Sequence, residues 1–132
     1  MDFSYVTTEE VDLTSAQILA LATTPIQVLP APEPGMMWEI LSTTISLTYS
    51  TAAYSGSADL YYGVDHTGQA LSSALSTVIA YTASKITTAK PALTGVVTAN
   101  LLNQPVYVAA SSNPTTGAGT VKITVVAVQV GV

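Results

Sequence analysis

The sequence has no cysteine and no arginine, and it has only one histidine and one tryptophan. The absence of cysteine excludes disulfides and thiolate metal sites. The absence of arginine, together with a net charge of −5, argues against nucleic acid as a partner, because counterion release and base recognition both need basic side chains. The single histidine, His66, cannot build an imidazole metal site alone.

Charge of either sign is scarce. Charged residues make up 8% of the chain and hydrophobic residues 48%, whereas charged residues usually form about a quarter of a soluble domain. No apolar run reaches the roughly 18 residues of a membrane span. The start, MDFSYVTTEE, has neither the basic region nor the apolar region of a signal peptide. We therefore expect a soluble chain, made inside the cell, with no membrane partner and with much of its surface covered by other subunits.

The few charges are segregated along the chain. All eight acidic residues lie at or before Asp65, and the three basic residues, Lys85, Lys90 and Lys122, lie after it. Separation in sequence need not persist in space, because β-topologies place distant strands side by side. The sequence alone therefore leaves the spatial distribution of charge open.

The N-terminal region predicts an arm and a short helix. Residues 1–12 are polar and acidic, and we interpret them as an arm ahead of one domain spanning residues 13–132. Thr14 and Gln17 have the spacing of a capping box, which predicts one or two helical turns over residues 15–21. A short strand, PIQVL, follows.

A stiff connector comes next. The stretch LPAPEPGMMWEI, residues 29–40, places three prolines and a glycine directly before Met36, Met37 and Trp38. Proline fixes φ and holds the preceding residue extended, so we expect a rigid link between two strands. Two interpretations of the three apolar residues stay open: they belong to the core, or they contact a neighbouring subunit or a capsid.

A long strand with period-two alternation follows the connector. We expect one face of this strand to be apolar and to pack in the core, with Leu41, Ile45, Leu47 and Tyr49 on it. The other face carries the hydroxyls of Ser42, Thr44, Ser46 and Thr48. Trp38 and Ile40 are out of phase with the apolar face. Either a β-bulge re-aims them, or the start of the strand is buried on both sides.

Further strands are expected at ADLYYG, at residues 77–81, twice within residues 85–99, at QPVYVAA and at VKITVVAVQV. The last strand changes phase, so that Val126, Val128 and Val130 face away from its earlier apolar side, which predicts cover on both faces and a subunit contact there. About eight strands, one short N-terminal helix and frequent turns predict an all-β antiparallel sandwich.

The chemical inventory predicts no enzyme. His66 stands beside Asp65 in a glycine-containing loop, but neither a serine elbow nor a cysteine nucleophile accompanies it. The acidic cluster of Glu9, Glu10 and Asp12 is interpreted as solvated surface, and TGAGT lacks the lysine of a phosphate-binding loop. We therefore assign no catalytic, metal-binding or cofactor-binding residue.

The order of these features resembles small phage and prophage virion proteins. The resemblance rests on LTSAQILALATTPIQVLPAPEPGMMWEILSTTISLTY in the first half, on the Pro-Val-Tyr-Val element, and on TGAGTVKITVVAVQV at the end. It does not extend to residues 50–99, and the aromatic residue often seen near the end is replaced by VQVGV.

The resemblance implies a jelly-roll sandwich that acts as a capsid decoration, or cement, protein. It implies binding at capsomer junctions, with the major capsid protein as partner. Because charged residues are so few, we also expect a stable homo-oligomer, a trimer rather than a dimer. The resemblance also implies a place on the virion surface after synthesis in the host cytoplasm. The alternative is a tail or fibre module that binds a host glycan or receptor, for which Tyr54, Tyr61 and Tyr62 are the residues of interest.

Overall fold

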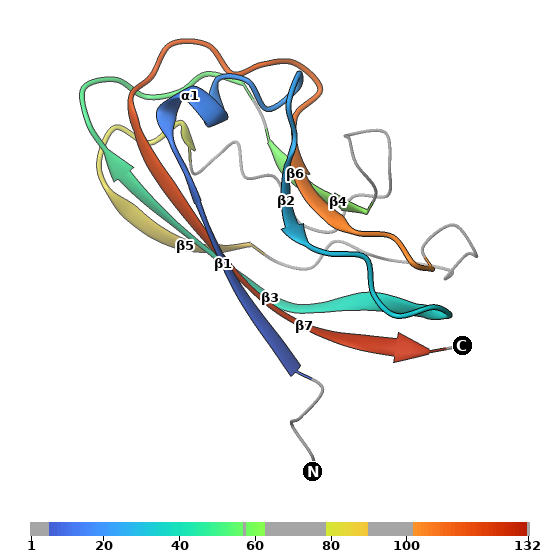
Figure 1. Cartoon of the computed structure of the whole chain (residues 1–132). Helices are drawn as coiled ribbons and strands as arrows, with labels where there is room; N and C mark the ends of the chain where they lie inside the picture. The colour runs from blue at the N-terminus through green and yellow to red at the C-terminus, as the bar shows by residue number, and fades with distance from the viewer. Residues whose placement is uncertain (1–5, 57, 63–78, 90–101, 132) are drawn as a thin grey trace.

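The computed structural model describes residues 6–56, 58–62, 79–89 and 102–131, which form two antiparallel β-sheets packed face to face (Figure 1). The larger sheet has the order β1-β7-β3-β5 and the smaller one the order β2-β6-β4. The strands are β1 (Val6–Leu13), β2 (Ile26–Leu29), β3 (Met36–Tyr49), β4 (Asp59–Tyr62), β5 (Lys85–Ala89), β6 (Val106–Ala109) and β7 (Gly119–Gly131). The predicted all-β sandwich is confirmed.

Successive described strands alternate between the two sheets. The odd-numbered strands form the larger sheet and the even-numbered strands the smaller one, an arrangement that is compatible with the expected jelly roll. The strand predicted at 77–81 is not formed over residues 79–81, where residue 79 is helical, residue 80 is in a turn and residue 81 is irregular. Residues 77 and 78, the region around Pro91 and Gly95, and His66 with Asp65 lie outside the described residues.

The core fills the space between the sheets. Alternate residues of the central strands point into it, and the largest fully buried side chains include Ile45, Leu60, Val106, Val108, Ile123 and Val125. The short helix α1 (Ser15–Ile18) lies over one end of the sandwich (Figure 1) and contributes Ile18.

The predicted capping box of α1 is confirmed. The Thr14 hydroxyl accepts from the Gln17 N–H at 3.3 Å, and the Gln17 side chain accepts from the Thr14 N–H at 2.9 Å. The helix ends sooner than expected, with Leu19 as its C-cap. Beyond it the Asn113 side-chain oxygen accepts from the N–H groups of Ala22 and Thr23, which fastens this segment to the loop before β7.

The segment expected as an acidic arm is instead a strand over most of its length. β1 pairs with β7 in eight consecutive antiparallel positions, from Val6 opposite Val128 to Leu13 opposite Val121. Val11 and Leu13 lie on the core side, while Glu10 and Asp12 alternate with them and remain exposed. The arm interpretation is therefore wrong for residues 6–12, because they form a strand whose Glu10 and Asp12 occupy the solvent side while Val11 and Leu13 occupy the core side.

Deleting residues 1–10 tests the role of β1. The deletion strips backbone pairing from the middle and end of β7, so it should lower the free energy of unfolding by at least about 2 kcal/mol, since each lost backbone hydrogen bond contributes roughly 0.5–1.5 kcal/mol. Chemical denaturation measures the difference. Glu10→Gln is the control, because it changes only an exposed carboxylate that lies 3.8 Å from Lys122 Nζ. An unchanged stability of the truncated chain would contradict the strand assignment.

Candidate interaction surface

The proline-rich connector, residues 30–35, is held in place by hydrogen bonds from distant parts of the chain. The Trp38 indole N–H donates to the Pro30 carbonyl at 2.8 Å. The Glu33 N–H donates to the Gln129 side chain at 3.1 Å, and the Gly35 N–H donates to the Asn103 side chain at 2.8 Å. The connector therefore forms a rigid rim at one end of the sandwich, as the prolines predicted.

Met37 and Trp38 belong to the core of this chain. Their side chains are 4% and 3% exposed, and both are part of the main hydrophobic cluster. Met36 is half-buried and lies across from Gly131, where an added Cβ would come within 3.0 Å of the Met36 sulfur. Of the two interpretations left open, burial favours the core for Met37 and Trp38, and it leaves little of either side chain for a neighbouring subunit.

A β-bulge at Leu41 explains why Trp38 and Ile40 are out of phase. Ile40 pairs with Ala127 and Ser42 with the adjacent Val126, so Leu41 is the extra residue. The inserted residue shifts the alternation by one, which brings Trp38 and Ile40 onto the same buried side as the rest of the strand. The bulge alternative is confirmed. Leu41 itself, expected on the core face, is 48% exposed, because the bulge removes it from that face.

β7 alternates without a break as far as Val128. Ala127 continues the buried series that starts at Val121, so the predicted facing of Val126 and Val128 away from that series is confirmed. Val126 and Val128 lie on the opposite, outer face and are half-buried there. Val130 pairs with Met37 and packs against the core cluster. Of the three valines expected at a contact, two therefore lie on the outer face.

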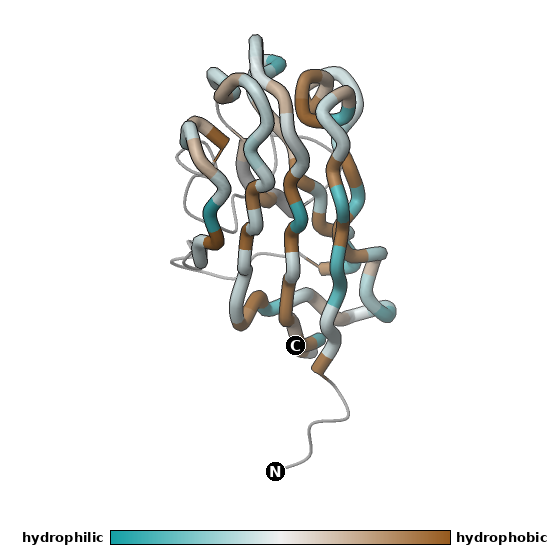
Figure 2. Tube along the Cα trace, turned by 90° about the vertical axis from the view of Figure 1, so that its left-hand side faces the viewer, coloured by the Kyte–Doolittle hydropathy of each residue, from teal (hydrophilic) through white to brown (hydrophobic). Residues whose placement is uncertain are grey.

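An apolar patch forms on this outer face near the bulge. Val128 pairs with Val6 of β1, and Val126 pairs with Ser42 directly after Leu41. Figure 2 shows the four strands of this sheet side by side. We call the set of Val6, Leu41, Val126 and Val128 the apolar patch. Sequence reasoning found its two β7 members, but it missed Val6 because β1 was not predicted.

The rest of the outer face carries hydroxyls and a few charges. On β3 and β7 the hydroxyl residues are Thr44, Ser46, Thr48, Thr120 and Thr124, and the charged residues are Lys122 and Glu39, which lies directly opposite Val128. Among the described residues, the ion pair on this face joins Lys122 and Glu10 at 3.8 Å, with both side chains about half exposed. An exposed ion pair of this kind contributes about 0–1 kcal/mol to the free energy of unfolding. The outer face therefore offers mainly aliphatic and hydroxyl groups, with four charged side chains, Glu10, Asp12, Glu39 and Lys122, among them.

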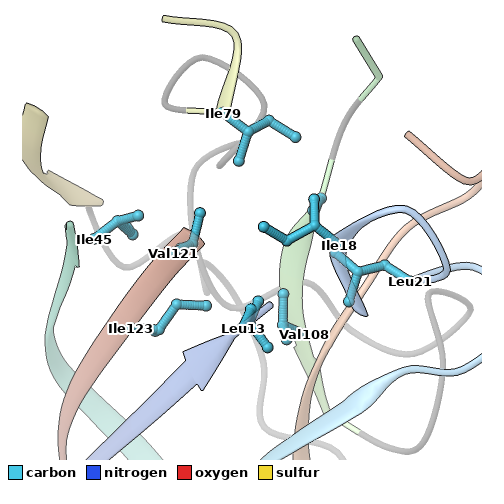
Figure 3. A pocket seen from close by; sticks show the side chains of 9 residues that line it. Leu13, Ile18, Leu21, Ile45, Ile79, Val108, Val121 and Ile123 are labelled. Atoms are coloured by element: carbon cyan, nitrogen blue, oxygen red, sulfur yellow. The ribbon is translucent and has the colours of Figure 1, made fainter. Parts of the chain in front are cut away.

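A small gap in the core does not form a ligand site. Figure 3 shows the side chains that surround it, drawn from both sheets and from the helical region. Its volume is about 10 Å³, and all nine residues that line it are apolar. A water molecule needs at least roughly 10–15 Å³ together with polar partners, so the gap is a dry packing defect.

The described residues hold no group of three histidine, cysteine, aspartate or glutamate side chains that could bind a metal. Within that same part of the chain, no helix is long and apolar enough to cross a membrane.

The three tyrosines proposed for a receptor-binding module lie in different parts of the fold. Tyr54 is 2% exposed, and its hydroxyl donates to the Gly119 carbonyl at 2.8 Å. A Cβ at Gly117 would approach the Tyr54 ring to 2.5 Å, so Gly117 leaves room for that ring. Tyr61 and Tyr62 lie in β4, opposite Tyr107 and Val106. Tyr54 therefore supports the fold and offers no surface for stacking on a sugar.

Comparisons with known proteins identify the fold. No family model matches the sequence, and no curated protein matches it. A chain of the capsid asymmetric unit of cyanophage Pam1 superposes with a TM-score of 0.56 at 21% identity, covering 93% of this chain and 82% of that chain. A chain of the capsid of Ralstonia phage GP4 gives a TM-score of 0.53 at 18% identity, covering 98% and 87%. This chain shares its fold with chains of two phage capsid structures. The neighbours agree with the resemblance to phage virion proteins.

Trp38→Ala separates the core interpretation from the contact interpretation. Emptying a buried indole site should cost the isolated protein roughly 3–5 kcal/mol of stability. Trp38→Phe should cost less, about 1–3 kcal/mol, because it keeps most of the ring and loses the donor to Pro30. Thermal and chemical unfolding measure both variants. A Trp38→Ala protein as stable as the wild type would contradict the core assignment.

Deleting Leu41 tests the bulge. Without the extra residue, the segment from Met36 to Ile40 must either turn its buried side chains to the outer face or shift its pairing with β7. We expect a loss of at least about 3 kcal/mol, comparable to emptying a large core site. Leu41→Ser is the matched control, because it keeps the bulge and changes only an exposed side chain. If both variants unfold at the same denaturant concentration as the wild type, the bulge does not set the register.

Proposed function

We propose that this chain is a structural, non-enzymatic virion protein that decorates and stabilises a phage capsid. In this proposal it binds the major capsid protein at capsomer junctions on the virion surface, as a homo-oligomer, after synthesis in the host cytoplasm. The observation that carries the proposal is the fold likeness to chains of two phage capsid structures, which extends over 93% and 98% of this chain.

The chemistry of the outer face supports attachment without strong ion pairing. The chain has three lysines, no arginine and a charged share of 8%. The apolar patch supplies half-buried and exposed aliphatic groups, and the threonine and serine hydroxyls on the same face can exchange hydrogen bonds with a polar neighbour. A contact of this composition is typical of a fixed assembly rather than of an electrostatically steered encounter.

Cementing follows from binding linkage. A protein that binds the assembled shell, and not its free subunits, stabilises the shell in proportion to the logarithm of its own concentration over the dissociation constant. No chemical step is needed. The rigid proline-rich rim beside the apolar patch limits the conformational entropy that is lost on docking.

Shell binding by patch variants tests the proposal. Val126→Glu and Val128→Glu place a carboxylate within the apolar patch and should reduce attachment to purified undecorated shells at least about tenfold, which corresponds to about 1.4 kcal/mol. Thr120→Glu is the matched control, since Thr120 is exposed on the same face of the same strand but lies at its other end. Co-sedimentation measures attachment, and unfolding temperatures show whether each variant is folded.

Two further measurements complete this test. Shells that carry the wild-type protein should disassemble at a higher temperature than bare shells. Attachment should persist at about 1 M salt, where the Debye length is roughly 3 Å. Equal attachment of the patch variants and the wild type would remove the apolar patch from the contact. Failure of the wild-type protein to bind shells, together with binding to host glycans on an array, would replace the proposal with the receptor-binding alternative.

A further inference from the structure

An exposed carboxylate lies beside the apolar patch. Glu39 on β3 is directly opposite Val128 on β7, and Val128 is opposite Val6 on β1, so the three residues form one row across the outer face. Residues paired in this way have their Cβ atoms about 5 Å apart. Leu41, which is 48% exposed, follows two positions along β3. Glu39 therefore occupies a position in the patch that an aliphatic residue would otherwise fill.

Glu39 has no partner for its charge among the described residues. The ion pair on this face is made by Lys122 with β1. Lys122 lies six residues before Val128 on β7, roughly 20 Å along the strand. Lys85, the other described lysine, pairs with a core-side residue of β3 and so points away from the outer face. No described basic side chain therefore reaches Glu39.

A contact that covers the apolar patch also removes water from the Glu39 carboxylate. A charge that loses its hydration without gaining a partner opposes binding. The same charge makes a contact selective when a cation meets it, because a surface without that cation is rejected. Glu39 thus opposes attachment to an uncharged surface and favours attachment to a surface with a matching cation.

We propose that the shell surface covering the apolar patch is itself apolar and presents one lysine or arginine to Glu39. This rests on the proposed function and names the chemistry of its partner surface. Charge complementarity supports it, because Glu33 in the nearby connector is also exposed, whereas Lys85 and Lys122 lie toward the other end of the larger sheet. The end of the sandwich that carries the patch is therefore acidic and favours a basic partner.

The pair is compatible with attachment that resists salt. Salt screens charges on an open surface much more than it screens a pair enclosed by a contact. A single enclosed pair also adds more to the selectivity of a contact than to its affinity. The aliphatic groups of the patch therefore remain the main source of binding free energy, and Glu39 selects the surface that they meet.

Neutralising Glu39 tests the proposal. Glu39→Gln keeps the size of the side chain and should weaken co-sedimentation with undecorated shells at least about tenfold, since it leaves the shell cation without its partner. Glu39→Lys sets two like charges against each other and should weaken it at least about a hundredfold. Glu10→Gln is the matched control, because it makes the same change in net charge on the same face, four residues from Val6 along β1. Its attachment should stay within about twofold of the wild type, and unfolding temperatures verify that each variant is folded.

Chemical modification of the shell identifies the cation. Acetylation neutralises lysine and phenylglyoxal blocks arginine, and treated shells are used when electron microscopy shows them intact. One of the two treatments should weaken attachment of the wild type about as much as Glu39→Gln does. The same treatment should weaken attachment of the Glu39→Gln variant little further, because both changes remove one and the same pair. Losses that simply add for both treatments would overturn the proposal.

Lys90→Gln tests for a cation within this chain, because Lys90 lies outside the described residues. This variant should attach within about twofold of the wild type, since its site is distinct from the proposed pair. An equal loss in Lys90→Gln and Glu39→Gln, with no further loss in the double variant, would assign the partner of Glu39 to the chain itself and overturn the proposal.

The remaining outcomes separate this inference from the proposed function. Attachment of Glu39→Gln equal to that of the wild type would overturn the pair. Tighter attachment of this variant, or its self-association in light scattering, would show that Glu39 keeps the patches of neighbouring copies apart instead. A loss that vanishes at about 1 M salt would indicate long-range attraction rather than an enclosed pair. In all three cases the wild type still binds shells and the proposed function stands, whereas a wild-type protein that does not bind shells would overturn both.

Discussion

The antiparallel ladder between β3 and β7 is the interaction on which the rest of the structure depends. It joins the two longest strands over 13 residue pairs, interrupted by the bulge at Leu41. β1 attaches to the free side of β7, and β5 attaches to the free side of β3. The buried rows of both central strands supply much of the core, and the bulge lets β3 keep Trp38 on the buried side at one end and Ile45 at the other.

Features that depend on local spacing could be predicted from the sequence. The capping box at Thr14, the rigid connector and the long alternating strand follow from side chains a few residues apart, and the structure contains all three. The bulge was one of two alternatives, because the sequence shows that the apolar residues of this strand change sides but does not show which backbone feature causes the change. β1 was missed, since the sequence of its first five residues, VTTEE, has no apolar periodicity until its partner β7 defines an inward side.

The candidate surface was predictable only in part, for the same reason. A run of apolar residues indicates surface that is to be buried, but it does not show whether it is buried by the same chain or by another molecule. Met37 and Trp38 are covered by their own chain, whereas Val126 and Val128 keep area on the outer face. The gathering of Val6, Leu41, Val126 and Val128 on one face could not be predicted either, because it requires the order β1-β7-β3, which arises from contacts between residues far apart in sequence.

The position of β7 has a consequence for synthesis. This strand occupies the interior of the larger sheet, yet it comes after every other described strand in sequence. During translation β1 has no partner in its sheet, and β3 has only β5, until β7 leaves the ribosome, and the Gln129 side chain that holds the connector arrives with it. The larger sheet therefore cannot be completed before the last strand is synthesised, because its central pairing joins residues far apart in sequence. A chain that ends before β7 therefore lacks one of the two interior strands of the larger sheet, and its β1 has no strand to pair with.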